Sequence, residues 1–69
     1  MDKELKIEGE FIKLDQVLKI SDIAVTGGHA KIIILDGKVK VNGEIVKQRG
    51  KKIKLGDMVE VEDIKIRLV

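Results

Sequence analysis

The sequence contains no cysteine, proline, tryptophan or tyrosine, and Phe11 is its only large aromatic residue. Without cysteine the chain can form no disulfide, so a reducing cytoplasm is the simpler expectation. Proteins that read single-stranded nucleic acid stack bases on several aromatic side chains, which this chain cannot supply. No apolar run approaches the roughly 20 residues that cross a bilayer. The acidic, polar N-terminus does not resemble a secretory signal. We therefore expect a cytoplasmic protein with no membrane partner.

Groups that carry catalysis are also scarce. His29 is the only histidine, and no cysteine accompanies it, so we expect no metal site. An enzyme would need a nucleophile with a base, paired carboxylates in an apolar cleft, or a metal cluster, and the sequence contains no such pattern. We predict a protein that is not an enzyme and that uses no cofactor.

The chain is long enough for one small domain, which we expect to span residues 1–69 without a linker or a repeat. Of its 69 residues 43% are hydrophobic, and most of these are Ile, Val or Leu. A domain of this size buries only about 60% of the surface that its unfolded chain exposes. The aliphatic side chains must therefore fill a compact core efficiently.

The net charge of +2 hides an uneven distribution. Residues 31–54 contain eight Lys or Arg against two Asp or Glu, a net charge of +6, whereas residues 1–30 and 55–69 each carry −2. A basic segment between acidic ends predicts a partner rich in negative charge. The simpler alternative is that these lysines only face water, as surface lysines commonly do.

A strand and a helix are predicted at the start of the chain. Residues 3–8 alternate apolar and charged side chains, which is typical of a short strand. Leu14, Val17 and Leu18 have the i, i+3, i+4 spacing of one helical face. This spacing predicts a helix over residues 14–20.

A second helix is predicted after a loop at Gly27-Gly28. Thr26 suits the N-cap position, and Gly37 suits the position where the helix stops. Between these two residues, Ala30, Ile33 and Ile34 repeat the i, i+3, i+4 spacing of an apolar helical face.

The stretch KVKVNGEIVK predicts a β-hairpin. Lys38 and Lys40 alternate with Val39 and Val41, so one face should be buried and the other basic. Asn42-Gly43 is a typical two-residue hairpin turn, because both of its residues must adopt positive φ.

Alternation returns over residues 58–62 and 64–68, after a turn at Gly56-Asp57, and predicts two final strands. The expected order is one strand, two helices and four short strands. The predicted fold class is α+β, with two short helices packed on a small, mostly antiparallel sheet.

Several short motifs follow one another in a fixed order along the chain. They are Lys13-Leu14-Asp15, Leu18, Ala30-Lys31, Ile34, Gly37-Lys38-Val39-Lys40-Val41-Asn42-Gly43 and Gly56-Asp57-Met58-Val59-Glu60-Val61. In this order and spacing they resemble the S-four RNA-binding domain, the alpha-L motif named after ribosomal small-subunit protein four. The resemblance covers residues 13–62, and the chain looks most like the small stand-alone bacterial members.

The resemblance implies the alpha-L fold and a module that binds structured RNA. Ribosomal RNA, transfer RNA and the ribosome are the expected partners, and the expected state is a monomer. The RNA should meet a basic face on the second helix and the following hairpin. The candidate RNA-binding residues are Lys13, Thr26, Gly27, Gly28, His29, Lys31, Lys38, Lys40, Asn42, Arg49, Lys51 and Lys52.

The residue types at these positions fit that expectation. Lysine ammonium groups suit phosphates, and the planar fork of Arg49 can bind one bidentately. The Gly27-Gly28 turn presents backbone N–H groups at a helix N-terminus, and His29 in the same turn could donate when protonated. Because aromatic platforms are missing, we expect contacts to phosphate and ribose of folded RNA, recognised by shape.

A protein-interaction adaptor that binds no RNA is the alternative function. Ile32 and Leu35 lie off the apolar face of the second helix, which allows them to be partly exposed, although packing in the core is favoured over an interaction patch. Asn42-Gly43 is, in the same way, expected to be first of all a turn. An exposed patch at Ile32 and Leu35 would favour the adaptor.

Overall fold

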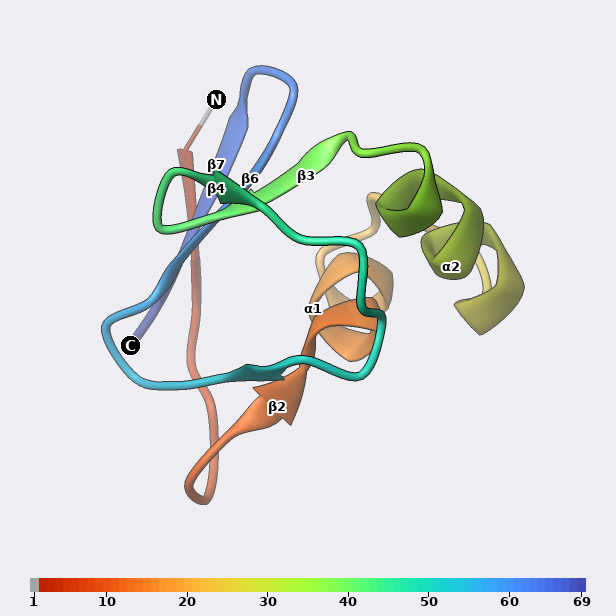
Figure 1. Cartoon of the computed structure of the whole chain (residues 1–69). Coiled ribbons are helices and arrows are strands. Elements are labelled where there is room, and N and C mark those ends of the chain that lie inside the picture. Colours follow the sequence, from red (N-terminus) through yellow and green to blue (C-terminus); the bar gives the residue numbers. More distant parts are fainter. Residues whose placement is uncertain (1) are drawn as a thin grey trace.

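The computed structural model describes residues 2–69, and in this range the chain forms two helices and seven short strands (Figure 1). The helices are α1 (Leu14–Ile20) and α2 (Gly27–Leu35). The strands are β1 (Asp2–Leu5), β2 (Ile12–Lys13), β3 (Val39–Val41), β4 (Glu44–Ile45), β5 (Lys52–Ile53), β6 (Met58–Val61) and β7 (Ile64–Leu68). The helices lie beside each other and share one core with the sheet, as the α+β prediction requires.

The larger sheet has the strand order β1-β7-β6-β3-β4. Its pairs are antiparallel except for β1 and β7, so the predicted mostly antiparallel sheet is confirmed. The parallel pair places Asp2 opposite Lys65 and Leu5 opposite Leu68, and thus joins the first strand to the last. The first strand covers Asp2–Leu5 rather than the expected residues 3–8.

A second, smaller sheet does not follow from the sequence pattern. β2 and β5 pair antiparallel, with Ile12 opposite Ile53 and Lys13 opposite Lys52. Each of these strands has two residues, which is too short to produce a recognisable alternation. Their pairing fastens the segment before α1 to the segment before β6.

Helix α1 has the predicted bounds, residues 14–20. Its apolar stripe of Leu14, Val17 and Leu18 is fully buried, which confirms the spacing argument. Lys3 on β1 donates from its ammonium group to the Ser21 carbonyl at 3.0 Å, just after the helix ends. The first strand and the end of α1 are held together in this way.

Helix α2 is capped as the sequence predicts. The Thr26 hydroxyl accepts a hydrogen bond from the His29 backbone N–H at 3.0 Å. Ala30 and Ile34 are fully buried against the core. Ile32 and Leu35 are 60% and 52% exposed, so they lie off the apolar face as the spacing indicates, and the favoured alternative that they pack in the core is wrong. Only one side of this short helix meets the rest of the fold.

Gly37 ends α2 in the left-handed region of backbone space, with a φ of +75°. Its N–H donates to the Ile34 carbonyl at 3.1 Å, and Lys38 donates to the Ile33 carbonyl at 3.4 Å. These are the two bonds of a Schellman motif, which favours glycine at this position. The predicted helix stop at Gly37 is confirmed.

The hairpin forms at the predicted turn. Asn42 and Gly43 have φ values of +52° and +89°, the positive values that a type I′ turn requires. Val39 and Val41 are buried, and Lys38 and Lys40 are exposed on the opposite face of β3. The returning strand β4 is short, because pairing with β3 covers only Glu44–Ile45.

The core is aliphatic and lies between the helices and the inner face of the larger sheet. Its fully or almost fully buried residues are Leu14, Val17, Leu18, Ala24, Ala30, Ile34, Val39, Val41, Ile53, Val59, Val61, Ile66 and Leu68. Among residues 2–69 no polar or charged residue is buried in it. No helix in this range has the length and apolar character that a bilayer crossing needs.

Candidate nucleic-acid interface

The loop of residues 46–51, between β4 and β5, packs against the start of α1. Leu14 donates its backbone N–H to the Lys51 carbonyl at 2.9 Å, and Asp15 donates to the Arg49 carbonyl at 3.1 Å. The first N–H groups of a helix have no partner within the helix, and α1 has no side-chain cap. The loop carbonyls take that role, so the backbone at Arg49 and Lys51 is fixed beside α1.

The pairing of β2 with β5 brings two more cations close to the contact between this loop and the start of α1. Lys13 lies opposite Lys52 in the antiparallel pair. We call Lys13, Arg49, Lys51 and Lys52 the basic cluster. All four residues are exposed, and within residues 2–69 no ion pair joins any of them to a carboxylate, although Lys51 lies near enough to Asp57 to help lower the pKa of that carboxyl. Four exposed cations thus come from the backbone segments that meet at the small sheet and the start of α1.

Phe11 supports one member of the basic cluster. The Lys52 ammonium nitrogen lies 4.8 Å from the centroid of the Phe11 ring, within the range of a cation–π contact. Such a contact at an exposed site contributes about 0.5–1 kcal/mol. Because Phe11 immediately precedes β2, the contact helps to hold the Lys52 side chain over the small sheet.

Asp15 also lies next to the basic cluster, although sequence reasoning did not include it in the site. Its Oδ1 atom is buried and accepts no hydrogen bond from residues 2–69. A carboxylate oxygen without a donor is uncommon inside a protein. The first turn of α1 therefore contains one carboxylate oxygen, Asp15 Oδ1, that accepts no hydrogen bond from residues 2–69 and lies beside the loop with Arg49.

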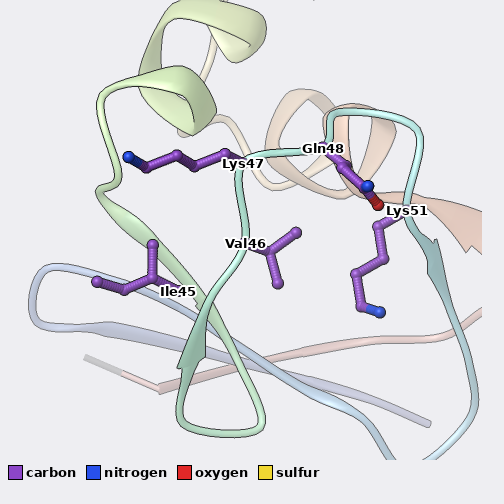
Figure 2. A pocket seen from close by; sticks show the side chains of 5 residues that line it. All are labelled: Ile45, Val46, Lys47, Gln48 and Lys51. Atoms are coloured by element: carbon purple, nitrogen blue, oxygen red, sulfur yellow. The ribbon is translucent and has the colours of Figure 1, made fainter.

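The same loop borders a hollow of about 430 Å³, lined by Ile45, Val46, Lys47, Gln48 and Lys51 (Figure 2). We call it the loop hollow. In Figure 2 the side chains of Lys47 and Lys51 lie on opposite sides of Val46, and Lys47 extends toward the chain that follows α2. Lys47 and Gln48 are absent from the sequence-based candidates, although their position in the most basic segment was a signal for them.

The predicted group Thr26, Gly27, Gly28 and His29 forms the N-terminal turn of α2. The ring of His29 accepts a hydrogen bond at Nδ1 from the Val25 backbone N–H, at 3.2 Å. That contact requires Nδ1 to be unprotonated, so the ring has only Nε2 left to donate outward. Lys31 follows on the exposed side of the same helix.

Lys38 and Lys40 lie on the outer face of the larger sheet, among carboxylates. Lys40 is directly opposite Glu60 on β6, and a hollow there is lined by Lys38, Lys40, Glu60 and Glu62. A neighbouring hollow includes His29, Lys38 and Glu62. His29, Lys38 and Lys40 therefore line hollows that also contain carboxylates. In this they differ from the residues of the basic cluster.

Asn42 has a structural use for its side chain. Its amide donates to Asp57 Oδ1 at 3.1 Å, and its Oδ1 accepts from the Met58 backbone N–H at 3.0 Å. Asp57 in turn accepts from the Lys54 backbone N–H at 2.8 Å. That bond, together with the Asn42 amide and nearby lysines, lowers the pKa of Asp57 below its ordinary value of 3.8. A role of Asn42 toward RNA stays a prediction.

The fold resembles that of a solved ribosomal protein. The 30S ribosomal protein S4e from Thermoplasma acidophilum superposes with a TM-score of 0.63 over 84% of this chain and 31% of that chain. The two sequences are 22% identical over the match, so the likeness concerns the fold.

Two curated proteins are similar in sequence. A probable ribosome maturation protein RlbA of Bacillus subtilis (strain 168) is 40% identical over 62 residues, which cover 90% of this chain and 87% of the relative. An uncharacterized RNA pseudouridine synthase of Aquifex aeolicus (strain VF5) is 41% identical over 51 residues, 74% of this chain but only 21% of that enzyme. The first relative is similar to this chain along nearly its whole length, whereas only a small part of the second is similar to it.

The family comparison agrees with the fold and with these relatives. Residues 5–69 match the family model described as the S4 domain, which is the S-four domain of the sequence resemblance. The match also includes β1 residue Leu5 and all of β7, beyond the motifs of residues 13–62. The chain therefore belongs to the S4 domain family.

Proposed function

We propose that this protein is a non-catalytic module that binds structured RNA and acts in association with the ribosome. The observation that carries the proposal is the basic cluster, whose exposed cations come from three segments that the backbone joins and form no ion pair with a carboxylate among residues 2–69. The names of the relatives agree with it, since one is a ribosome maturation protein and another a ribosomal protein. Ribosomal RNA is the first candidate ligand, and transfer RNA is the second.

The arrangement of the basic cluster suits phosphates along a folded backbone. Two backbone hydrogen bonds hold Arg49 and Lys51 against α1, and strand pairing sets Lys13 opposite Lys52. Cations on a rigid support lose less conformational freedom when they bind than cations on a mobile tail. Arg49 can bind one phosphate bidentately, while the lysines act as point charges.

Recognition by the shape of the RNA is favoured over reading of long single strands. Phe11 is the only Phe, Tyr or Trp in the chain, and its ring already carries the Lys52 ammonium group. Single-strand readers need several free aromatic faces for successive bases. The predicted residues of α2 and the hairpin, from Thr26 to Lys31 together with Lys38, Lys40 and Asn42, would then meet the RNA at the edge of the interface.

A catalytic role is not part of this proposal. Among residues 2–69 no group of three or more His, Cys, Asp or Glu side chains could hold a metal ion. The similarity to the pseudouridine synthase covers 21% of that enzyme, so its activity does not carry over to this chain. The module would act by binding alone, in the cytoplasm, where ribosomes assemble.

A fluorescence anisotropy titration tests the proposal. A structured ribosomal RNA hairpin and a DNA duplex of equal length are titrated with the protein at several salt concentrations. We expect RNA to bind more tightly, with a log–log salt slope of about −3 for about four phosphate contacts. Absence of binding at the lowest salt concentration would reject RNA binding.

A second candidate function rests on the exposed apolar side chains of α2. Ile32 and Leu35 are 60% and 52% exposed, which is unusual for large aliphatic residues that stand close together on one helix. An adaptor would use them to contact a protein. The double variant Ile32→Glu, Leu35→Glu would then lose a protein partner that the wild type retains in a pull-down, and the wild type itself would not bind the RNA hairpin.

A further inference from the structure

We propose that the loop hollow, lined by Ile45, Val46, Lys47, Gln48 and Lys51, receives one unpaired nucleotide of the bound RNA. This inference rests on the proposed RNA binding and adds a site that reads a single base. It departs from recognition by shape alone. The ligand that we propose is a flat, partly apolar base with one phosphate before it and one after it in the RNA chain.

The charge around the loop hollow distinguishes it from three other hollows on this surface. Each of those three contains at least one carboxylate beside its cations. The carboxylates are Glu60 and Glu62 in the first hollow, Asp2 and Glu4 in the second, and Glu62 in the third. The loop hollow contains Lys47 and Lys51 and no carboxylate. It is also the largest of the four, at about 430 Å³ against about 260, 160 and 310 Å³. Of these four hollows, the loop hollow therefore offers an anionic ligand cations without a competing carboxylate.

Two of the five residues that line the loop hollow, Ile45 and Val46, are apolar. Ile45 is 57% exposed and Val46 is half-buried against the core. β4 is the last strand of the larger sheet, so no further strand lies beyond Ile45. Aliphatic side chains beside a free edge can pack against the face of a base, which removes apolar surface of both partners from water.

Gln48 supplies a group that can read the edge of a base. Its side chain is exposed, and no residue between 2 and 69 forms a hydrogen bond with its amide. A glutamine amide offers a donor and an acceptor side by side, which matches the adjacent donor and acceptor of adenine. The preferred base is therefore adenine.

The two lysines complete the fit to a nucleotide within a chain. Lys47 and Lys51 both line the loop hollow; in Figure 2 Lys51 lies on the side to which Val46 points, and the Lys47 side chain extends from the other side toward the chain that follows α2. An unpaired nucleotide has one phosphate before it and one after it, and each lysine can meet one of them. A free mononucleotide carries phosphate on one side only and would therefore contact only one of the two lysines.

The loop hollow adjoins the basic cluster, and Lys51 belongs to both. The backbone of Lys51 is fixed by its bond from Leu14, so the two surfaces keep one relative position. RNA that lies on the basic cluster would therefore bring a neighbouring unpaired nucleotide to the loop hollow. A hairpin with a single-nucleotide bulge has this shape, whereas a fully paired hairpin does not.

The test compares two RNA hairpins that differ only by one bulged adenosine, by anisotropy at constant salt. Wild-type protein should bind the bulged hairpin at least about fivefold more tightly, the discrimination expected from one bidentate base contact. Gln48→Ala should reduce this preference, because the base-edge contact is lost, and leave affinity for the paired hairpin unchanged. Lys13→Ala, a matched control in the basic cluster, should weaken binding of both hairpins by the same factor.

Separate outcomes distinguish the two proposals. Equal binding of both hairpins by the wild type, or an unchanged preference in Gln48→Ala, would overturn the nucleotide site while RNA binding stands. No binding of either hairpin would overturn both proposals. Adenosine monophosphate is the second probe: if it displaces the bulged RNA at concentrations near the affinity of that RNA, the hollow holds a free nucleotide and the inference is wrong. A thermal melt by circular dichroism verifies that each variant is folded.

Discussion

Asn42 and Asp57 connect two turns that lie 15 residues apart in the chain. The Asn42 amide donates to one carboxylate oxygen of Asp57 at 3.1 Å, while the other oxygen accepts the Lys54 backbone N–H at 2.8 Å. The hairpin turn is thereby tied to the turn that precedes β6. A single carboxylate thus connects both turns.

Asp57→Ala is predicted to destabilise the fold. The change removes the acceptor of the Lys54 N–H and of the Asn42 amide, and both groups are exposed enough for water to replace part of the loss. We expect the free energy of unfolding to fall by about 1–2 kcal/mol. Urea denaturation measures it, with Glu8→Ala, an exposed carboxylate in a loop, as the control. A loss no greater than that of the control would contradict a structural role for Asp57.

The stability of the protein should fall at acidic pH because of the same residue. Hydrogen bonds from the Lys54 backbone and the Asn42 side chain lower the pKa of Asp57 below 3.8. A lowered pKa means that the folded state favours the ionised form, so this stabilisation is fully present above pH 3.8 and is lost as the pH falls through the folded-state pKa. Urea denaturation at pH 5 and pH 3 should therefore show a smaller acid loss in Asp57→Asn than in the wild type. If the wild type and Asp57→Asn lost the same free energy of unfolding between pH 5 and pH 3, Asp57 would not contribute to the acid sensitivity.

Replacement of Lys51 and Lys52 by Ala should weaken RNA binding without unfolding the domain. Both side chains are exposed, and Lys51 holds α1 through its backbone carbonyl, which the substitution keeps. Loss of two phosphate contacts should reduce the magnitude of the log–log salt slope by about 1.4–1.8. Lys65→Ala, opposite Glu60 on the outer face of the sheet, is the matched control and should leave the slope unchanged. A folded double variant with wild-type affinity would exclude these residues from the interface.

Val41→Asp should prevent folding. Val41 is 5% exposed on the inner face of β3, and no cation of residues 2–69 is buried near enough to pair with a new carboxylate. Burial of an unpaired charge costs several kcal/mol, which is comparable with the whole stability of a small domain. Lys40→Ser on the outer face of the same strand is the control and should stay folded. Circular dichroism distinguishes the two, and a cooperative melt of Val41→Asp near that of the wild type would contradict this description of the core.

Local pattern was sufficient for much of the fold. The bounds of α1, the Thr26 cap and the Asn42-Gly43 turn each depend on residues within about four positions of one another. Hydrophobic spacing, capping and turn preference act over that range, so the sequence alone predicts these features. The order of motifs was also sufficient to indicate the family, which the match over residues 5–69 bears out.

The candidate site depended on pairings that no local pattern contains. Lys13 and Lys52 meet because β2 pairs with β5, and Arg49 and Lys51 lie beside α1 because their carbonyls accept its first N–H groups. Lys38 and Lys40 follow the same alternation as any exposed strand residues, yet tertiary pairing sets Lys40 opposite Glu60. Sequence therefore predicted which residues are basic and exposed. Long-range backbone hydrogen bonds decided which of them share a surface, because only the closed fold brings distant segments within bonding distance.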